Sequence, residues 1–262
     1  MKILVCIKQV INSDKIEYNA QTKTIKRSAQ HLINNPADLS ALEFALKIKD
    51  AYNDAYITTL SMGPDECKNK IKELIEVGCD SCVLLTDKRL VGSDAYSTAY
   101  ALAKSIEKLG DFDLILCGES SLDGETSIVP PQIAEYLNIP HIASASDIKV
   151  LDTQRIEVER KLENQLFRFE VKLPALISVK KDSAYLRLPK LSLMLKALCY
   201  TPQIVNLADL ENFDFSKVGI EGSKTLVNRF IEQSFDNNKC EIYENIDDSQ
   251  IECIANIVMR LI

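Results

Sequence analysis

Five short apolar runs, separated by longer segments, constrain the fold of this chain more than any other feature. Each run is rich in apolar and β-branched residues, which is typical of a strand buried on both faces of a parallel sheet. The runs are Lys2 to Lys8, Tyr56 to Leu60, Ser81 to Leu85, Leu114 to Cys117 and Ala175 to Val179.

Three segments with helical periodicity lie between the first four runs. Helices are expected at Pro36 to Ala51, Pro64 to Val77 and Ser93 to Leu109. Two of them begin at a proline and two end before a glycine, Gly78 or Gly110, as helices commonly do. Strands and helices that alternate at this spacing predict an α/β fold with a doubly wound parallel sheet.

The pattern changes after Pro140. Three short segments of mostly alternating polar and apolar residues follow, with a predicted hairpin turn at 162–165, and they lie at Ile148 to Leu151, Arg155 to Arg160 and Leu166 to Lys172. Alternation indicates antiparallel strands with one face in water. We therefore expect a short antiparallel flank on the parallel sheet.

The chain beyond residue 185 has a different texture, in which a basic, leucine-bearing segment is followed by loosely patterned residues and by a polar stretch from Phe230 to Asn245. We predict an α/β domain at 1–185. At 186–262 we predict an extended arm that ends in an amphipathic helix at Asp247 to Ile262. The apolar stripe of that helix must be buried, either on its own domain or on a partner subunit.

Composition and charge argue against several classes of protein. The formal net charge of -7 is spread along the chain, which argues against nucleic-acid binding. No apolar run approaches the roughly 20 residues that span a bilayer, so membrane insertion is not expected. Residues 1–10 are interpreted as a first strand rather than a signal peptide, and a cytoplasmic location is expected.

The eight cysteines mostly lie in apolar runs or on helical faces, which favours reduced, structural thiols. Cys79 and Cys82 have the C-x-x-C spacing of a redox pair or of half a metal site. A closed zinc site needs four ligands, and His31 and His141 are isolated in the sequence. The structural interpretation is preferred, and no metal site is expected.

The stretch from Asp111 to Leu137 is the candidate binding region. A strand ending at Cys117 leads past Gly118 into a loop of mostly small and polar residues and then into a helix opened by two prolines. Open α/β sheets bind ligands beyond the carboxyl ends of their strands, and a helix N-terminus offers free backbone N–H groups. We therefore expect a phosphate or nucleotide seat at residues 118–132.

Six short motifs occur in an informative order. They are K-I-L-V-C-I-K-Q-V at 2–10, N-P-x-D at 35–38, S-M-G-P at 61–64, G-S-D at 92–94, D-G-x-T at 123–126 and P-Q-I-A-E at 131–135. This set resembles the β subunit of electron transfer flavoprotein, including its FixA branch. The resemblance implies a Rossmann-like domain in a heterodimer with an α subunit, which holds or shares the redox-active FAD. It also implies a bound adenine nucleotide in this chain, either a structural AMP or, in electron-bifurcating relatives, a second FAD.

Transferred to this sequence, the resemblance implies nucleotide contacts at the end of the first strand, in the N-P-x-D and S-M-G-P motifs and in the loop that contains Gly118. The candidate residues are Ile7, Lys8, Gln9, Asn35, Asp38, Met62, Gly63, Gly118, Asp123, Gly124 and Thr126. Asp38 also fits a helix cap or a first-turn acid, and Asp123-Gly124 fits a simple turn.

The same loop departs from the family pattern. An arginine of the pattern is Glu119 here, a glutamine is Ile128 and a glycine is Pro130. Glu119 replaces a cation with an anion and Pro130 removes a backbone N–H, and both changes are unfavourable close to a phosphate. A weakened, altered or lost nucleotide seat is therefore an alternative.

The segment Arg187 to Ala197 resembles the family's loop that docks into partner dehydrogenases, such as an acyl-CoA dehydrogenase. Leu191 aligns with the anchoring leucine of that loop, with Arg187 and Lys196 on either side. A small apolar side chain in a pocket can dominate a modest interface. The alternative is that the leucines of the segment pack inward.

The resemblance implies the function of an electron carrier subunit, which shuttles electrons between a dehydrogenase and an acceptor through FAD on the α subunit. The sequence offers no plausible Ser-His-Asp or Cys-His arrangement and no G-x-x-x-x-G-K-[ST] loop, so catalysis by this chain is not expected. The alternatives are a bifurcating subunit with a second FAD, an adenine-nucleotide module without electron transfer, and a scaffold without a nucleotide.

Overall fold

The computed structural model describes residues 1–11, 17–19, 24–26, 32–52 and 54–226, together with isolated positions between 247 and 259. Met1–Leu226 forms one compact unit, and Val227–Ile262 is a second unit. The candidate site residues predicted from the sequence all lie in the first unit.

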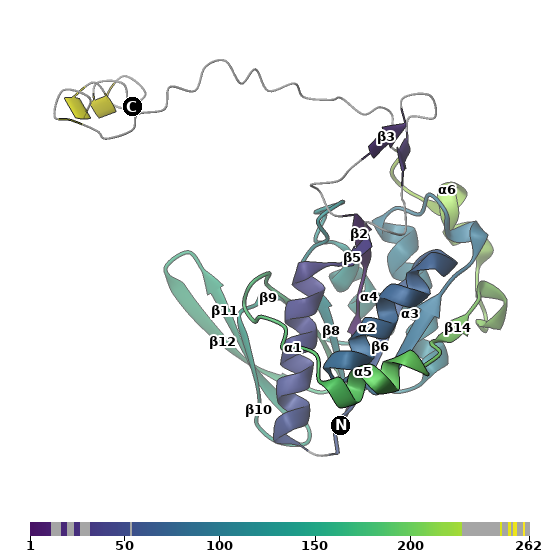
Figure 1. Cartoon of the computed structure of the whole chain (residues 1–262), viewed down its shortest axis with the longest axis horizontal. Coiled ribbons are helices and arrows are strands. Elements are labelled where there is room, and N and C mark those ends of the chain that lie inside the picture. The colour runs from purple at the N-terminus through teal and green to yellow at the C-terminus, as the bar shows by residue number, and fades with distance from the viewer. Residues whose placement is uncertain are drawn as a thin grey trace. The chain divides into compact units, whose positions relative to one another are not determined.

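A seven-stranded parallel sheet with the strand order β14-β7-β6-β1-β8-β13-β9 forms the centre of the first unit (Figure 1). The chain first builds outward from β1 through β6 and β7, and then returns to β8 on the other side of β1. This reversal confirms the predicted doubly wound sheet. The strands are β1 Lys2–Cys6, β6 Tyr56–Met62, β7 Ser81–Leu85, β8 Leu114–Gly118, β9 His141–Ala145, β13 Ala175–Val179 and β14 Gln203–Val205.

Helices cover both faces of the sheet. Ile3 and Val5 of β1 pack on the side of α1 and α2, whereas Leu4 and Cys6 pack on the side of α3 and α4. Both sides of β1 are therefore buried, as its continuous apolar run predicts. The helices are α1 Pro36–Ala51, α2 Lys68–Val77, α3 Ala95–Leu109, α4 Val129–Leu137, α5 Leu191–Leu198 and α6 Gly219–Gly222, with short 3-10 turns at Asp65–Cys67, Lys88–Leu90, Leu207–Asp209 and Phe215–Lys217.

Local sequence explains where the long helices begin and end. The Asp94 carboxylate accepts the N–H of Ser97 at 3.0 Å and so caps α3, which ends before Gly110. Gly78 follows α2 with a φ of 124°, a left-handed conformation that favours glycine. α2 itself begins later than predicted, because Asp65–Cys67 forms a 3-10 turn.

The predicted antiparallel flank is present as a three-stranded sheet in the order β10-β11-β12. Its strands are β10 Asp147–Val150, β11 Arg155–Leu162 and β12 Gln165–Lys172. Glu163 and Asn164 form the hairpin turn, and Glu163 has a φ of 50°. Two short antiparallel pairs follow the first strand along the chain. They are β2 Gln9–Ile11 with β5 Leu32–Asn34, and β3 Glu17–Asn19 with β4 Thr24–Lys26.

Residues 201–223 differ from the expected loose segment. β14 joins the edge of the parallel sheet beside β7, and Leu207 and Val218 are buried behind it. β14 was not predicted because a strand of three residues has too short a pattern to be recognised in a sequence. With this strand and the residues that follow it, the compact unit continues past residue 185 to Leu226.

The polar stretch Phe230 to Asn245 lies outside the described residues. In the predicted terminal helix, the described positions Ile251, Glu252, Ile254, Ala255 and Met259 have helical backbone. Within the described part of the chain, no helix is both long and apolar enough to cross a membrane.

Leu207→Ala tests whether residues 201–223 belong to the core. Leu207 is fully buried, so its truncation should lower the free energy of unfolding by about 3 kcal/mol in urea titrations. Leu198→Ala is the matched control, because Leu198 is exposed and its loss should change the free energy by less than about 0.5 kcal/mol. Equal, small effects of the two substitutions would contradict the observed packing.

Candidate functional site

The carboxyl ends of β6, β1 and β8 bring the predicted site residues to one edge of the sheet. Ile7 and Lys8 follow β1, Met62 ends β6 and is followed by Gly63, and Gly118 ends β8. Strand order reverses between β1 and β8, and open α/β sheets commonly bind ligands at such a reversal. The predicted seat is thus at the expected place in the topology.

Asp38 joins the two strands at this reversal. It lies in the first turn of α1, and its buried carboxylate accepts the backbone N–H of Lys8 at 2.7 Å and that of Gly118 at 2.9 Å. Burial raises the pKa of Asp38 to about 6, although the hydrogen bonds and the Lys8 charge oppose this rise. Asp38 is the first-turn acid that one interpretation of the sequence expected, and it also holds the strand ends.

Gly118 is a point of close approach between β8 and α1. A Cβ at this position would lie 2.4 Å from the Asp38 Oδ1 atom and 2.7 Å from two atoms of Ala37. The backbone N–H of Gly118 is already donated to Asp38. Packing therefore requires the glycine, and its N–H group is not available to a phosphate in this conformation.

Asn35 connects the start of α1 to the loop that follows β8. Its side-chain Nδ2 donates to the Ser120 carbonyl at 2.8 Å, and its Oδ1 accepts the Leu122 N–H at 3.2 Å. Its backbone N–H donates to the Lys8 carbonyl at 2.9 Å. Asn35 therefore shapes the loop and ties it to the end of β1.

Lys8 reaches across the edge to the same loop. Its Nζ lies 2.6 Å from Asp123 Oδ1 and 3.2 Å from Ser121 Oγ. Burial acts to raise the pKa of Asp123, but the hydrogen bond and charge of Lys8 outweigh it, so the pKa lies below its usual value. The ammonium group is thus paired, and a phosphate would have to share it with Asp123.

Two buried glutamine oxygens are left without a partner in the described structure. Gln9 donates its amide to Asn34 Oδ1 at 3.0 Å and to Ser61 Oγ at 3.2 Å, while its Oε1 accepts nothing. The Oε1 of Gln132 in α4 is in the same situation. Buried acceptors are normally satisfied, so these two favour an additional donor such as an amine or hydroxyl group.

The remaining candidate residues either form backbone hydrogen bonds with neighbouring strands or lie exposed in the loop before α4. Ile7 is buried and donates its N–H to Leu60, and Gly63 donates to Leu85. Gly124 and Thr126 are exposed in the loop before α4. The Thr126 hydroxyl has no hydrogen-bond partner among the described residues and is available to a ligand.

The residues that depart from the family pattern lie around the same loop. The Glu119 carboxylate accepts a hydrogen bond from the backbone N–H of Lys181 at 3.1 Å, so one of its oxygens already has a donor. Ile128 is exposed immediately before α4, and Pro130 is buried in the first turn of that helix. The prolines reduce the number of N–H donors at the start of α4.

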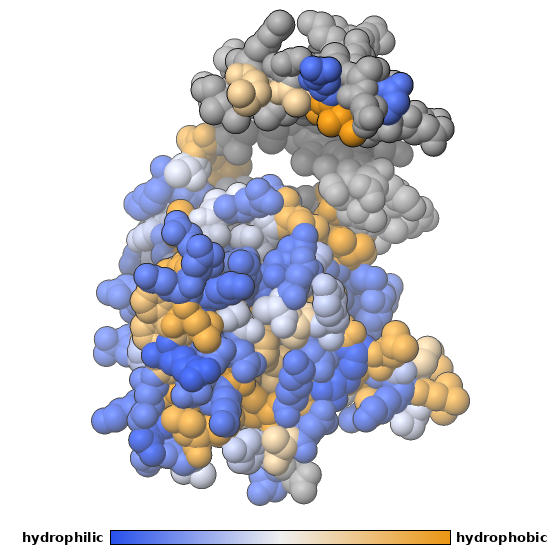
Figure 2. All heavy atoms as spheres, turned by 90° about the vertical axis from the view of Figure 1, so that its left-hand side faces the viewer, coloured by the Kyte–Doolittle hydropathy of each residue, from blue (hydrophilic) through white to orange (hydrophobic). Residues whose placement is uncertain are grey.

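The predicted docking segment contains α5 and is strongly apolar on its surface. The exposed fractions are 85% for Leu188, 74% for Leu191, 60% for Leu195 and 77% for Leu198. The alternative that these leucines pack inward is therefore wrong. Lys196 is exposed in the last turn of the helix, whereas Arg187 forms ion pairs with Glu43 and Asp50. Figure 2 shows how apolar groups interrupt a mainly hydrophilic face of the molecule.

Cys79 and Cys82 are both buried. Burial raises the pKa of Cys82 to about 12 and that of Cys79 well above its usual value, so both thiols are protonated at neutral pH. This favours the structural interpretation over a redox pair. In the ranges that the structure describes, no group of three or more His, Cys, Asp or Glu side chains could hold a metal ion. His31 lies outside those ranges.

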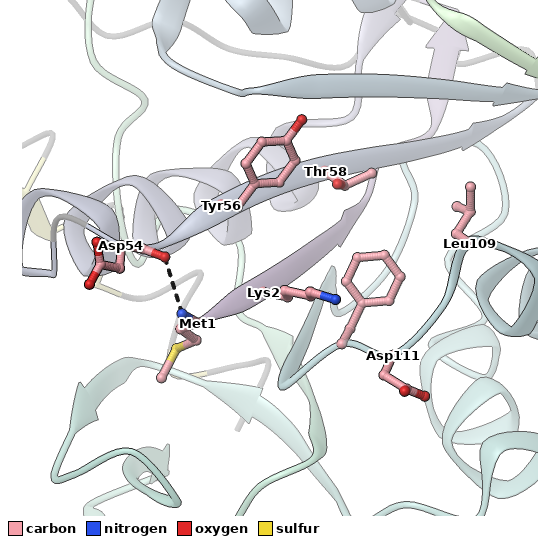
Figure 3. A pocket seen from close by; sticks show the side chains of 8 residues that line it. Met1, Lys2, Asp54, Tyr56, Thr58, Leu109 and Asp111 are labelled. Atoms are coloured by element: carbon pink, nitrogen blue, oxygen red, sulfur yellow. Dashed lines mark hydrogen bonds between the residues drawn. The ribbon is translucent and has the colours of Figure 1, made fainter.

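A depression of about 530 Å³ lies at the amino ends of the strands, opposite the candidate site (Figure 3). Lys2 and Tyr56, which begin β1 and β6, line it, and the Met1 amine donates to the Asp54 carbonyl at its rim. None of the predicted nucleotide residues lines this depression, which is therefore separate from the candidate site.

The fold and the candidate edge define an α/β protein with a candidate binding region at a topological reversal. The family model named electron transfer flavoprotein domain matches residues 22–190. The chain belongs to the electron transfer flavoprotein family, in the group of β subunits and FixA proteins, as its ordered motifs predict.

Three relatives illustrate the range of this family. Electron transfer flavoprotein subunit beta of Megasphaera elsdenii is 40% identical over 87% of this chain and 86% of its own length. Protein FixA of Azorhizobium caulinodans is 35% identical over 87% and 83%. Caffeyl-CoA reductase-Etf complex subunit CarD of Acetobacterium woodii is 36% identical over 70% and 69%.

The contacts that shape the site were only partly accessible to sequence analysis. The sequence identified the motif residues but not the residues that they contact. The missed partners are Ser121 for Lys8, Leu122 for Asn35 and Glu43 for Arg187. Asn35 and Leu122 are 87 positions apart, and Glu43 and Arg187 are 144 apart. Hydrophobic periodicity carries no signal for such polar pairs.

Gly118→Ala tests the close approach of α1 to β8. The added methyl group would collide with Asp38 and Ala37, so the free energy of unfolding should fall by about 2–3 kcal/mol. Gly124→Ala, in the loop that follows β8, is the matched control, because the atom nearest to its added Cβ would be Ser121 Oγ at 3.4 Å, an ordinary contact. If both substitutions change the free energy of unfolding in urea by the same small amount, the close approach of α1 to Gly118 is contradicted.

Asp38→Asn tests the titration of the buried carboxyl group. Because the folded pKa is raised from 3.8 to about 6, Asp38 stabilises the fold most below pH 3.8, and this contribution is lost as the pH rises through 6. The rise corresponds to about 3 kcal/mol. The free energy of unfolding of wild type minus that of the variant should therefore fall by about that amount between about pH 4 and pH 7.

The lowered pKa values of Asp87, Asp94 and Asp123 act in the opposite direction, but they are common to both proteins and cancel in the difference. A constant offset from the lost hydrogen bond is expected at all pH values. A difference that does not change with pH would show that Asp38 titrates normally.

Proposed function

We propose that this chain is the β subunit of a heterodimeric electron transfer flavoprotein. In this proposal an α subunit carries the redox-active FAD, and the heterodimer passes electrons between a dehydrogenase and an acceptor in the cytoplasm. The observation that carries the proposal is membership of the family combined with the motif residues that meet at the β6-β1-β8 edge. The chain itself is proposed to be a carrier subunit and not a catalyst of bond chemistry.

The same edge is proposed to hold an adenine nucleotide, either AMP or a second FAD. The unpaired Oε1 atoms of Gln9 and Gln132 fit a ligand with amine or hydroxyl donors, as adenosine has. Met62 and Gly63 would frame the adenosine at the end of β6, and Thr126 would donate its hydroxyl to a phosphate. AMP would fill the site structurally, whereas a bound FAD would supply a second redox centre.

The phosphate end is the less favourable part of this seat. Lys8 would bind a phosphate only by sharing its charge with Asp123, and Gly118 already donates its N–H to Asp38. A shift of the loop that carries Asp123 and Gly124 would release Lys8. We therefore propose that the loop rearranges when a phosphate binds.

The exposed leucines of the docking segment are proposed to contact the dehydrogenase. Leu191 is the central anchor, and Lys196, exposed in the last turn of the same helix, favours acidic groups on the partner. One relative is by name a subunit of a caffeyl-CoA reductase-Etf complex, which supports a partner that acts on a CoA thioester, such as an acyl-CoA dehydrogenase.

Co-expression with the α subunit from the same organism tests the proposal. We expect a yellow heterodimer, and identification of the small molecules released on denaturation should give one FAD and one AMP per heterodimer. Two FAD molecules would support the bifurcating alternative instead. FAD without any second nucleotide would support a scaffold role for this chain, and a colourless monomer would overturn the proposal.

Gln9→Met tests the position of the nucleotide in the same heterodimer. The substitution keeps the size of the side chain but removes the unpaired acceptor, so the AMP or second-FAD content should fall at least about tenfold after gel filtration. Gln154→Met, at an exposed turn, should retain full occupancy. Full occupancy in both variants would place the nucleotide elsewhere.

A further inference from the structure

Arg187 stands at the start of the docking segment but faces the interior of the domain. Its guanidinium makes a two-point contact with Glu43 of α1, with Nη2 at 2.9 Å from Oε1 and Nε at 3.1 Å from Oε2. Its backbone N–H also donates to Glu43 Oε2 at 3.0 Å. One carboxylate therefore fixes both the side chain and the main chain of Arg187.

The Glu43 carboxylate is itself well buried, with 7% of its side chain exposed, and the Arg187 side chain is 22% exposed. Planar two-point pairs of this kind define an orientation as well as a distance. Asp50, about two turns further along the same face of α1, adds a contact of 2.8 Å to Nη1, but its own side chain is 61% exposed. Solvent weakens the contact with Asp50, so Glu43 is the main partner.

The rest of the docking segment is attached mainly to α2, against which α5 packs. Ala197 is the buried residue of α5 and Leu193 is partly buried, whereas Leu191, Leu195 and Leu198 of this helix are exposed. Lys190 donates its N–H to the Glu76 carbonyl of α2 at 3.1 Å. Leu186 and Pro189 border a groove of about 350 Å³ beside α1 and α2.

We propose that Arg187 and Glu43 form a latch that fixes the docking segment on α1, so that Leu191 and its neighbours are presented to the dehydrogenase in one orientation. Arg187 is then a positioning residue that does not touch the partner, which differs from its sequence-based assignment to the docking contact. The inference rests on the proposed function. A loosened segment would lose conformational freedom on docking, which weakens the complex.

Arg187→Lys and Glu43→Gln, made in the co-expressed heterodimer, test the latch. Lysine keeps the positive charge but cannot form the two-point contact, and glutamine keeps the shape of Glu43 without its charge. The matched control is Arg89→Lys, because Arg89 makes a similar two-point contact with Asp87 in another part of the fold. Leu191→Ala serves as the reference for a residue that contacts the partner directly.

Two measurements are needed for each variant. The first is the KM for the heterodimer in its reduction by an acyl-CoA dehydrogenase. The second is amide hydrogen exchange over residues 186–198, in which the amide of Arg187 reports the bond to Glu43 directly. Flavin content and subunit stoichiometry confirm that the heterodimer is otherwise intact.

The latch predicts that both variants raise the KM about tenfold, leave kcat unchanged and speed up exchange within 186–198. Arg89→Lys should change neither quantity, and Leu191→Ala should raise the KM without changing exchange. A raised KM in Arg187→Lys with normal exchange would mean that Arg187 contacts the partner, and this would overturn the proposal. Faster exchange with an unchanged KM would also overturn it.

Failure of the latch can be distinguished from failure of the proposed function. If the wild-type heterodimer accepts no electrons from any acyl-CoA dehydrogenase, the docking proposal fails. Hydrogen exchange still reports whether Glu43 holds the segment in that case. If wild type is active and the variants behave as wild type in both measurements, the latch alone is overturned.

Discussion

The buried carboxylate of Asp38 is the interaction on which the arrangement of the candidate site depends. It accepts N–H groups from the ends of β1 and β8, which meet where the strand order reverses. β1 and β8 pair directly from Ile3 to Val5, and beyond that pairing the Asp38 carboxylate connects their ends. The same contact places the first turn of α1 against Gly118 and leaves no room for a larger residue there.

Helix α1 consequently links the two regions proposed to have a function. Its N-terminal end shapes the loop after β8 through Asn35, and its middle holds the docking segment through Glu43. Apolar residues of the helix, such as Leu42 and Leu46, fix it to the sheet. Because α1 contacts the loop after β8 at its start and the docking segment at its middle, one helix positions both the candidate ligand site and the interaction surface.

Sequence analysis recovered most of the sheet because strands buried on both faces leave a clear apolar signature. It missed β14, which has only three residues, and β9, in which polar and apolar residues are mixed. The site residues were found through motifs rather than through their contacts. Their pairing, such as that of Lys8 with Asp123 across 115 positions, depends on how the strands are ordered.

The sequence by itself determined the α/β class, the positions of the long helices and the family, because these follow from local periodicity and from ordered motifs. Only the tertiary structure decided which groups are free to bind a ligand or a partner. Lys8 and Gly118 turn out to be engaged, Gln9 retains an unpaired acceptor, and Arg187 faces inward while Leu191 faces solvent. The physical reason is that hydrogen bonds and ion pairs between distant segments form only once the sheet has brought those segments together.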